Sequence, residues 1–187
     1  LRCLALMQHH GAPTRLVDFT KSPFVAAFFA LWHLQGDAAV FALNTPALWK
    51  AAPRFDPSLH RDVIDLRKPG NYQRYFANNN HGLVWFGEPN QMDARLVAQS
   101  GILVVPGMLD VPLETLLAGY DSDEPLLRKF ILPAQVREEA LRALYRMNIT
   151  AATLFPGLDG LARSIGYELE MVWEQLIVDY RQRLSTD

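Results

Sequence analysis

The first quarter of the chain alternates between helix-like and strand-like hydrophobic patterns. Apolar positions recur at helical spacing over residues 1–10, residues 14–20 alternate between two sides, and residues 24–34 are apolar almost throughout. A further apolar run covers residues 38–43. Because a period near 3.6 residues indicates a helix and a period of two indicates a strand, these patterns predict helix, strand, buried helix and strand in that order.

Capping and turn residues mark the boundaries of these elements. Gly11 suits the left-handed position that follows a helix. Ser22 and Pro23 are typical of an N-cap followed by proline at the first helical position. In the strand, Asp18 and Thr20 project to the same side. We therefore expect the N-terminus of the second helix, with its unpaired N–H groups, to face a ligand beside Thr20.

The rest of the chain alternates short apolar runs with turns and ends in helices. Strands are expected at 83–86, 102–105 and 127–132, with a candidate edge strand at 61–66. Short helices are expected at 71–78 and 112–117, and either a short helix or an extended segment at 91–98. An amphipathic helix is expected at 133–147, and a long helix at 158–184 whose apolar stripe either completes the core or meets a partner. These elements predict an α+β fold, with a small mixed β-sheet and helices around it.

Length and composition narrow the class of protein. The chain has 187 residues, of which 50% are hydrophobic, so we expect one domain over 1–187 with a C-terminal helix over 157–187. The net charge of −2 disfavours nucleic acid as the main partner. Cys3 is the only cysteine, which excludes an internal disulfide and a cysteine-rich zinc site, and indicates a cytoplasmic protein.

No apolar segment reaches the roughly 20 residues that cross a bilayer. Because the chain starts at Leu1, without Met and inside a predicted helix, we expect a natural N-terminal part upstream.

Polar side chains concentrate between the first helix and the start of the second. They include imidazole, guanidinium, carboxylate, amide and hydroxyl groups, contributed by Gln8, His9, Thr14, Arg15, Asp18, Thr20 and Ser22. Few stable cores need so many polar groups between two apolar segments. This stretch is therefore the expected ligand-binding site. His9 and His10 point about 100° apart on a helix, so no metal site is expected there.

Several of these residues have a structural alternative. Arg15 and Asp18 lie on opposite faces of the strand and could each satisfy backbone groups. His9 could interact with the C-terminus of its helix instead of donating a proton or binding a ligand. Arg95 and Gln99, four residues apart, would share a helical face that either points into a cleft or is solvated.

Residues 7–23, with Ala26 to Ala30 after them, closely resemble the hallmark segment of the FRG domain, a bacterial family named for an upstream Phe-Arg-Gly motif. The resemblance continues through 95–101, 128–133 and 154–161. Phe19 stands where the family usually has tryptophan, and the Phe-Arg-Gly motif itself is not in this sequence.

The order of elements also resembles that of ADP-ribosyltransferases that use NAD. Residues 18–22 resemble their Ser-Thr-Ser strand, residues 26–30 the helix after it, and Gln99 the position of their late glutamate. The likeness implies NAD as cofactor, with hydroxyls on the nicotinamide ribose and an arginine and a helix N-terminus at the pyrophosphate. Gln99 cannot ionise, so either Glu88 or Asp93 would replace the glutamate, or the protein would bind a nucleotide without transfer.

The two resemblances lead to one functional hypothesis and one alternative. The first is an NAD-binding, ADP-ribosyltransferase-like effector of bacterial antiphage defence, with a nucleotide or other small molecule as ligand and a protein as acceptor. We assign catalytic roles to Gln99, Arg15 and His9, and cofactor contacts to Gln8, Thr14, Asp18, Thr20, Ser22 and Arg95. The alternative is a non-catalytic sensing or protein-interaction module in which the polar cluster is structural.

Overall fold

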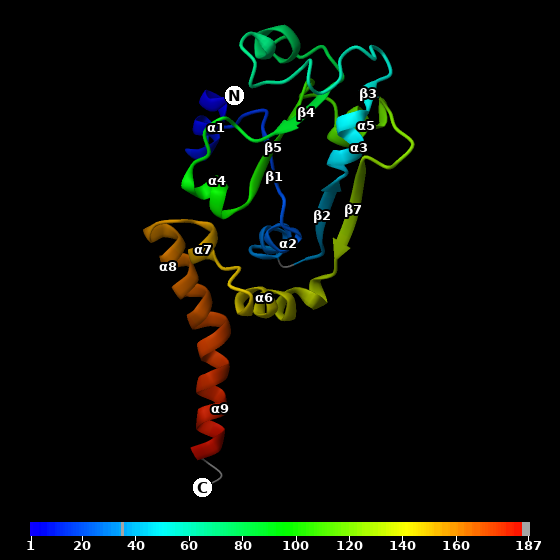
Figure 1. Ribbon diagram of the computed structural model, residues 1–187. Helices are drawn as coiled ribbons and strands as arrows, with labels where there is room; N and C mark the ends of the chain where they lie inside the picture. Colours follow the sequence, from blue (N-terminus) through cyan, green and yellow to red (C-terminus); the bar gives the residue numbers. More distant parts are fainter. Residues whose placement is uncertain (35, 185–187) are drawn as a thin grey trace.

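A computed structural model describes residues 1–34 and 36–184 as a body of small sheets and helices, from which a C-terminal helix projects (Figure 1). The chain begins with α1 (Arg2–His9), β1 (Val17–Thr20), α2 (Pro23–Leu31) and β2 (Ala38–Leu43). This order confirms the helix, strand, helix and strand predicted from the hydrophobic pattern. Gly11 has a φ of +81°, as expected for the left-handed residue after a helix.

The middle of the chain supplies the remaining strands. Its elements are α3 (Thr45–Lys50), β3 (Ala52–Pro53), η1 (Tyr72–Phe76), β4 (Val84–Gly87), α4 (Ala94–Ala98), β5 (Gly101–Pro106), α5 (Leu113–Ala118), β6 (Tyr120–Asp121) and β7 (Leu127–Leu132). The C-terminal part is helical, with η2 (Ala134–Val136), α6 (Arg137–Arg146), α7 (Ala151–Leu154), α8 (Leu158–Tyr167), η3 (Glu168–Trp173) and α9 (Glu174–Leu184).

The strands form three small sheets, which together with the helices confirm the α+β class. One sheet has the order β1-β5-β4, and the others pair β2 with β7 and β3 with β6. All of these pairs are antiparallel over the described residues, so the expectation of mixed pairing was wrong. The reason is that α2 connects strands of two different sheets, β1 and β2, instead of parallel neighbours in one sheet.

The predicted edge strand at 61–66 is also wrong, because this segment forms turns. The Arg61 side chain is buried: its Nε donates to the Phe86 carbonyl at 3.1 Å and its Cζ lies 3.8 Å from the centre of the Trp49 ring. Burial lowers the pKa of Arg61 below its ordinary value. Asp65 accepts three hydrogen bonds from the Arg67 guanidinium, at 3.0, 3.1 and 2.7 Å. These side-chain interactions stabilise the turns in place of a strand ladder.

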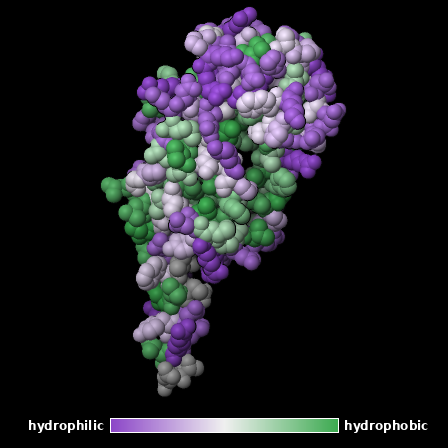
Figure 2. Space-filling view, in the orientation of Figure 1, coloured by the Kyte–Doolittle hydropathy of each residue, from purple (hydrophilic) through white to green (hydrophobic). Residues whose placement is uncertain are grey.

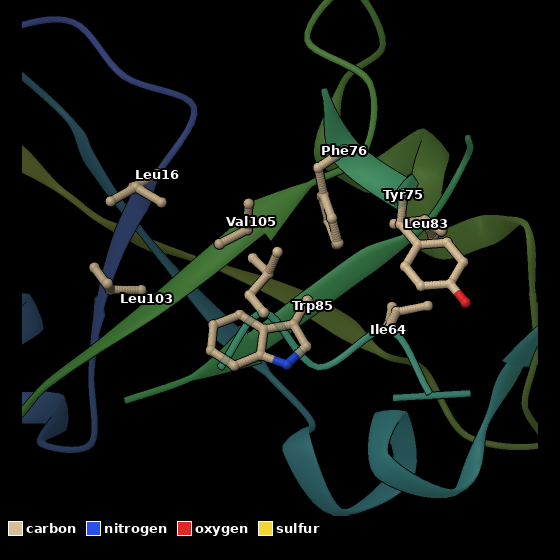
Figure 3. Packing of buried hydrophobic residues seen from close by; sticks show 9 residues of the cluster. Leu16, Ile64, Tyr75, Phe76, Leu83, Trp85, Leu103 and Val105 are labelled. Atoms are coloured by element: carbon tan, nitrogen blue, oxygen red, sulfur yellow. The ribbon is translucent and has the colours of Figure 1, made fainter. Parts of the chain in front are cut away.

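The core lies on both faces of the β1-β5-β4 sheet. Trp85, Leu103 and Val105 pack on one face with Phe76 and Ile64, as Figure 3 shows. The intervening strand residues pack on the other face, in a cluster that includes Val84, Phe86, Val104, Leu116 and Tyr120. Side chains alternate between the faces of a strand, so β4 and β5 read as continuous apolar runs because both faces are covered.

A third apolar cluster holds α2 against the C-terminal helices. Phe28 and Leu31 of α2 pack with Leu144 of α6 and with α7. Arg137, the first residue of α6, donates from Nε to the Leu31 carbonyl at 2.9 Å. The apolar pattern of the 133–147 segment predicts that Val136, Ala140, Leu144 and Met147 face inward. Leu144 is buried, as predicted, whereas Val136 and Met147 are 40% and 48% exposed, so the prediction is wrong for these two.

The C-terminal helix leaves the body after α8. Figure 1 shows η3 and α9 extending away from the sheets. Large apolar side chains along α8, η3 and α9 are 48–64% exposed, among them Leu161, Ile165, Leu169, Leu176, Tyr180 and Leu184. Figure 2 shows other hydrophobic residues gathered across the middle of the body, whereas its upper end is mostly hydrophilic. The apolar stripe of the helix therefore does not complete the core of the described chain.

Candidate functional site

A cavity of about 640 Å³ lies between the β1-β5-β4 sheet and the β2-β7 pair. One wall comes from β1 and α4, a second from β2, β7 and α5, and α2 contributes the side between them. The lining residues are Val17, Asp18, Phe19, Thr20, Ala26, Phe29, Ala30, Ala39, Val40, Phe41, Arg95, Gln99, Leu113, Glu114 and Leu127. A cavity of this size accommodates a small organic ligand.

Two strand edges face this cavity. The cavity is lined by every residue of 17–20 in β1 and of 39–41 in β2. Successive side chains of a strand point to opposite faces, so a cavity on one face would contact only every second residue. The cavity therefore borders the edges of both strands. On its other edge, β1 pairs with β5 and β2 pairs with β7.

The hydrogen-bond register identifies the backbone groups that point into the cavity. Lys21 N–H donates to the Ser100 carbonyl at 3.0 Å, one position beyond the pairing of Thr20 with Gly101. Bonded and unbonded residues alternate along an antiparallel pair, so the backbone groups of Asp18 and Thr20 point away from β5. By the same argument, the bond from Asn44 N–H to the Leu126 carbonyl directs the backbone of Phe41 toward the cavity. The cavity is thus bordered by N–H donors and carbonyl acceptors of two strand edges.

Thr20 and Gln99 lie on the same wall and are joined by a hydrogen bond. Thr20 Oγ1 donates to the Gln99 carbonyl at 2.7 Å and accepts from Ser22 N–H at 3.1 Å. The Gln99 side chain donates from Nε2 to the Leu154 carbonyl at 3.0 Å. The two residues therefore do not face each other across a cleft, and the opposite wall is formed by β2 and α5.

Arg95 is held at the α4 end of the cavity by an aromatic ring. Its Cζ lies 4.9 Å from the centre of the Phe155 ring, which also has Arg163 Cζ at 5.4 Å. Of these two arginines, Arg95 lines the cavity. A guanidinium so placed can donate two parallel hydrogen bonds to a phosphate or carboxylate.

A smaller cavity of about 60 Å³ adjoins the first and brings several predicted site residues together. Gln8, His9, Asp18, Arg95 and Gln99 all line it, and the last three also line the larger cavity. His9 Nδ1 lies 3.3 Å from an Asp93 carboxylate oxygen, and Asp93 Oδ1 accepts from Leu96 N–H at 2.7 Å as the N-cap of α4.

The polar residues before β1 form a hydrogen-bonded brace between α1 and β1. Gln8 Nε2 donates to Asp18 Oδ1 at 2.7 Å, and Thr14 Oγ1 donates to Gln8 Oε1. Thr14 Oγ1 also accepts from Leu16 N–H at 3.2 Å. Thr14 does not line either cavity, so its position supports Gln8 and Asp18 instead of contacting a ligand there.

Arg15 and Ser22, two further predicted site residues, lie outside both cavities. Arg15 is buried, with its guanidinium 5.6 Å from the Tyr72 ring centre and 3.4 Å from the Pro106 carbonyl. Ser22 is the N-cap of α2 and accepts from Val25 N–H at 3.4 Å. The larger cavity is lined by the face of α2 that contains Ala26 and Phe29. The N-terminus of α2 does not line it, so the expectation that this N-terminus faces the ligand was wrong.

The carboxylates considered as replacements for a catalytic glutamate have other contacts. Glu88 forms an ion pair with Lys21, and Asp93 caps α4. Neither residue lines the larger cavity. Glu114 does line it, and the sequence pattern, which showed only a short helix at 112–117, gave no signal for this role. Its position becomes evident only when α5 lies beside β2.

Residues 1–34 and 36–184 contain neither a metal-binding cluster nor a membrane-spanning helix. Within them, no group of three histidine, cysteine, aspartate or glutamate residues is arranged to hold a metal ion. Within the same residues, none of the helices combines the length and the apolar character needed to span a bilayer.

Comparison with known proteins gives one family match. Neither the curated proteins nor the solved structures contain a significant match to this chain. Residues 1–37, which comprise α1, β1 and α2, match the model of the family described as the FRG domain, and this match confirms the predicted resemblance for that part of the chain.

Proposed function

We propose that the 640 Å³ cavity binds a nucleotide, with NAD as the ligand. The observation that carries this proposal is the gathering of Asp18, Thr20, Arg95 and Gln99, from segments about 80 residues apart in sequence, around one cavity. Arg95 has the chemistry to neutralise a phosphate, and Thr20 and Asp18 have the chemistry to bind ribose hydroxyls. The strand-edge N–H and carbonyl groups match the donor and acceptor of a carboxamide.

We further propose an ADP-ribosyltransferase-like reaction as the use of this ligand. In that reaction the bond between ribose C1′ and the nicotinamide nitrogen breaks, nicotinamide leaves, and C1′ bonds to a nucleophile of a protein acceptor, which loses its proton. This step rests on the resemblance in element order. Within it, Gln99 would contact the ribose through Oε1, and His9 would act as a proton carrier. A role in bacterial antiphage defence, in the cytoplasm, belongs to the same proposal.

Replacing Arg95 tests the binding step. Because hydrogen bonds to charged groups contribute about 1.5–3 kcal/mol, Arg95→Ala should weaken NAD binding roughly tenfold or more, measured by calorimetric titration. Arg163→Ala is the matched control, since Arg163 contacts the same Phe155 ring but does not line the cavity. Equal losses in the two variants would contradict a phosphate contact at Arg95. If neither NAD nor ADP-ribose binds the unmodified protein, the nucleotide proposal fails.

A second candidate function, a protein-interaction module, is favoured by the exposed C-terminal helix. Leu161, Ile165 and Leu169 repeat every four residues, as do Leu176, Tyr180 and Leu184, and all six are about half exposed. Antiparallel pairing with a second copy of the chain would place one trio against the other and bury both. Such pairing would also stabilise α9, because most helical stability in proteins comes from the packing of an apolar face.

Light scattering tests this pairing. We expect the mass of a dimer for the unmodified protein and that of a monomer for Leu169→Glu with Leu176→Glu, since each charge would be buried in the interface. Gln135→Glu, on η2 and away from the helix, adds a charge without touching the stripe and should remain a dimer. A monomeric unmodified protein would exclude the second copy as the partner.

A further inference from the structure

Glu114 is a carboxylate at the junction of two cavities. It lies in the first turn of α5 and lines both the 640 Å³ cavity and an adjoining cavity of about 500 Å³, together with Phe41 and Leu127. Its side chain makes no hydrogen bond or ion pair with any residue in 1–34 or 36–184 that the structure describes. The carboxylate is therefore available to a ligand.

Arg95 and Glu114 lie at different ends of the larger cavity. Arg95 is shared with the small cavity beside α1 and α4, whereas Glu114 is shared with the 500 Å³ cavity beside β6 and β7. Figure 1 shows α4 and α5 on opposite sides of β1 and β2. The larger cavity thus has the Arg95 guanidinium at one end, with the Asp18 carboxylate near it, and the Glu114 carboxylate at the other end. One cation and two carboxylates suit a ligand with an anionic part and a cationic part.

Of the three phenylalanines that line the larger cavity, two lie on α2 and β2. Phe29 of α2 and Phe41 of β2 both line the cavity, and they are 42% and 37% exposed. Lys129 Nζ lies 5.7 Å from the Phe41 ring centre and repels a cationic ligand there, whereas the Glu114 carboxylate, which lines both cavities, attracts it. Aromatic faces attract cations and stack on flat rings, so a flat cationic ring fits beside Phe41 and Glu114 better than a neutral or an anionic group.

We propose that Glu114 and Phe41 form a subsite for a flat cationic ring, and that the protein thereby selects NAD in its oxidised form. This inference rests on the proposed nucleotide function. The nicotinamide ring of NAD carries a positive charge, the ring of NADH is neutral, and ADP-ribose has no such ring. All three ligands carry the same pyrophosphate, so Arg95 treats them alike and Glu114 distinguishes them.

Calorimetric titration of the full chain with NAD, NADH and ADP-ribose tests the subsite. Exposed charge pairs contribute at most about 1 kcal/mol, so NAD should bind about fivefold more tightly than NADH. Glu114→Gln should lower the affinity for NAD to that for NADH and leave NADH and ADP-ribose unchanged. The preference should also shrink as the salt concentration rises. Glu139→Gln, which removes the same charge from the exposed side of α6, should bind all three ligands as the unmodified protein does.

The outcomes separate this inference from the function on which it rests. Binding of NADH and ADP-ribose without any preference for NAD would overturn the cationic subsite and leave nucleotide binding intact. A preference for NAD that persists in Glu114→Gln, or an equal loss of all three ligands, would overturn the role of Glu114. Failure of all three ligands to bind the unmodified protein would overturn both.

Discussion

Replacing Trp85 with alanine should remove about 3–5 kcal/mol from the free energy of unfolding, the range typical of a fully buried large aromatic side chain. Trp85, on the edge strand β4 of the β1-β5-β4 sheet, is 0% exposed within the core cluster that covers one face of this sheet. A Cβ at Gly87 would lie 2.6 Å from its ring, so the surrounding chain fits this one side chain closely. Since folded domains are stable by only about 5–15 kcal/mol, the variant should be near its unfolding threshold. Urea denaturation monitored by circular dichroism measures the change.

Two further variants separate burial from chemistry at this position. Phe130→Ala removes an aromatic side chain that is 53% exposed on β7, and should cost less than half as much. Trp85→Phe keeps a ring in place and removes an indole N–H that has no hydrogen-bond partner among the described residues, so its cost should be intermediate. A loss for Trp85→Ala no greater than that for Phe130→Ala would contradict the central position of Trp85 in the core.

Elements specified by neighbouring residues were predictable from the sequence. Ser22 and Pro23 determine the start of α2 locally, and the Ser22 cap is present in the structure. The turn segment at 61–66 was not predictable, because Arg61 is held by Trp49 and by the Phe86 carbonyl. Those partners are distant in sequence, and a local apolar pattern contains no information about them.

The candidate site likewise contains residues that the sequence identified and residues whose position depends on tertiary packing. Asp18, Thr20, Arg95 and Gln99 were recognised from the strand pattern and the family resemblance, and all four line the larger cavity. Glu114 was missed because its position depends on the packing of α5 beside β2. Arg15 has the residue type expected of a catalytic group, but its burial against Tyr72 and the Pro106 carbonyl depends on tertiary packing. Residue type and spacing thus identified one wall of the cavity, and the opposite wall required the fold.

Tyr120 should make the stability of the protein fall at alkaline pH. Burial raises the pKa of Tyr120 from 10.0 to about 12, partly opposed by its hydrogen bond with the Val84 backbone. Its hydroxyl accepts from Val84 N–H at 2.7 Å and donates to the Val84 carbonyl at 3.3 Å. Between pH 10 and about pH 12 the unfolded chain loses this proton while the folded chain keeps it, so the free energy of unfolding decreases as pH rises.

The contribution of Tyr120 is fully present below pH 10 and should be lost by about pH 12, a decrease of about 2–3 kcal/mol in the free energy of unfolding. Tyr120→Phe isolates it, because every other titrating group remains. At neutral pH this variant should be less stable by about 1–3 kcal/mol, since the Val84 backbone groups lose their partner. The free energy of unfolding of the variant should nevertheless decline less between pH 10 and 12. Urea denaturation at several pH values measures this. The difference in free energy of unfolding between the two proteins should shrink as pH rises and reach or pass zero near pH 12. A difference that stays constant over this range would mean that Tyr120 titrates alike in the folded and unfolded chains, and would contradict its burial against Val84.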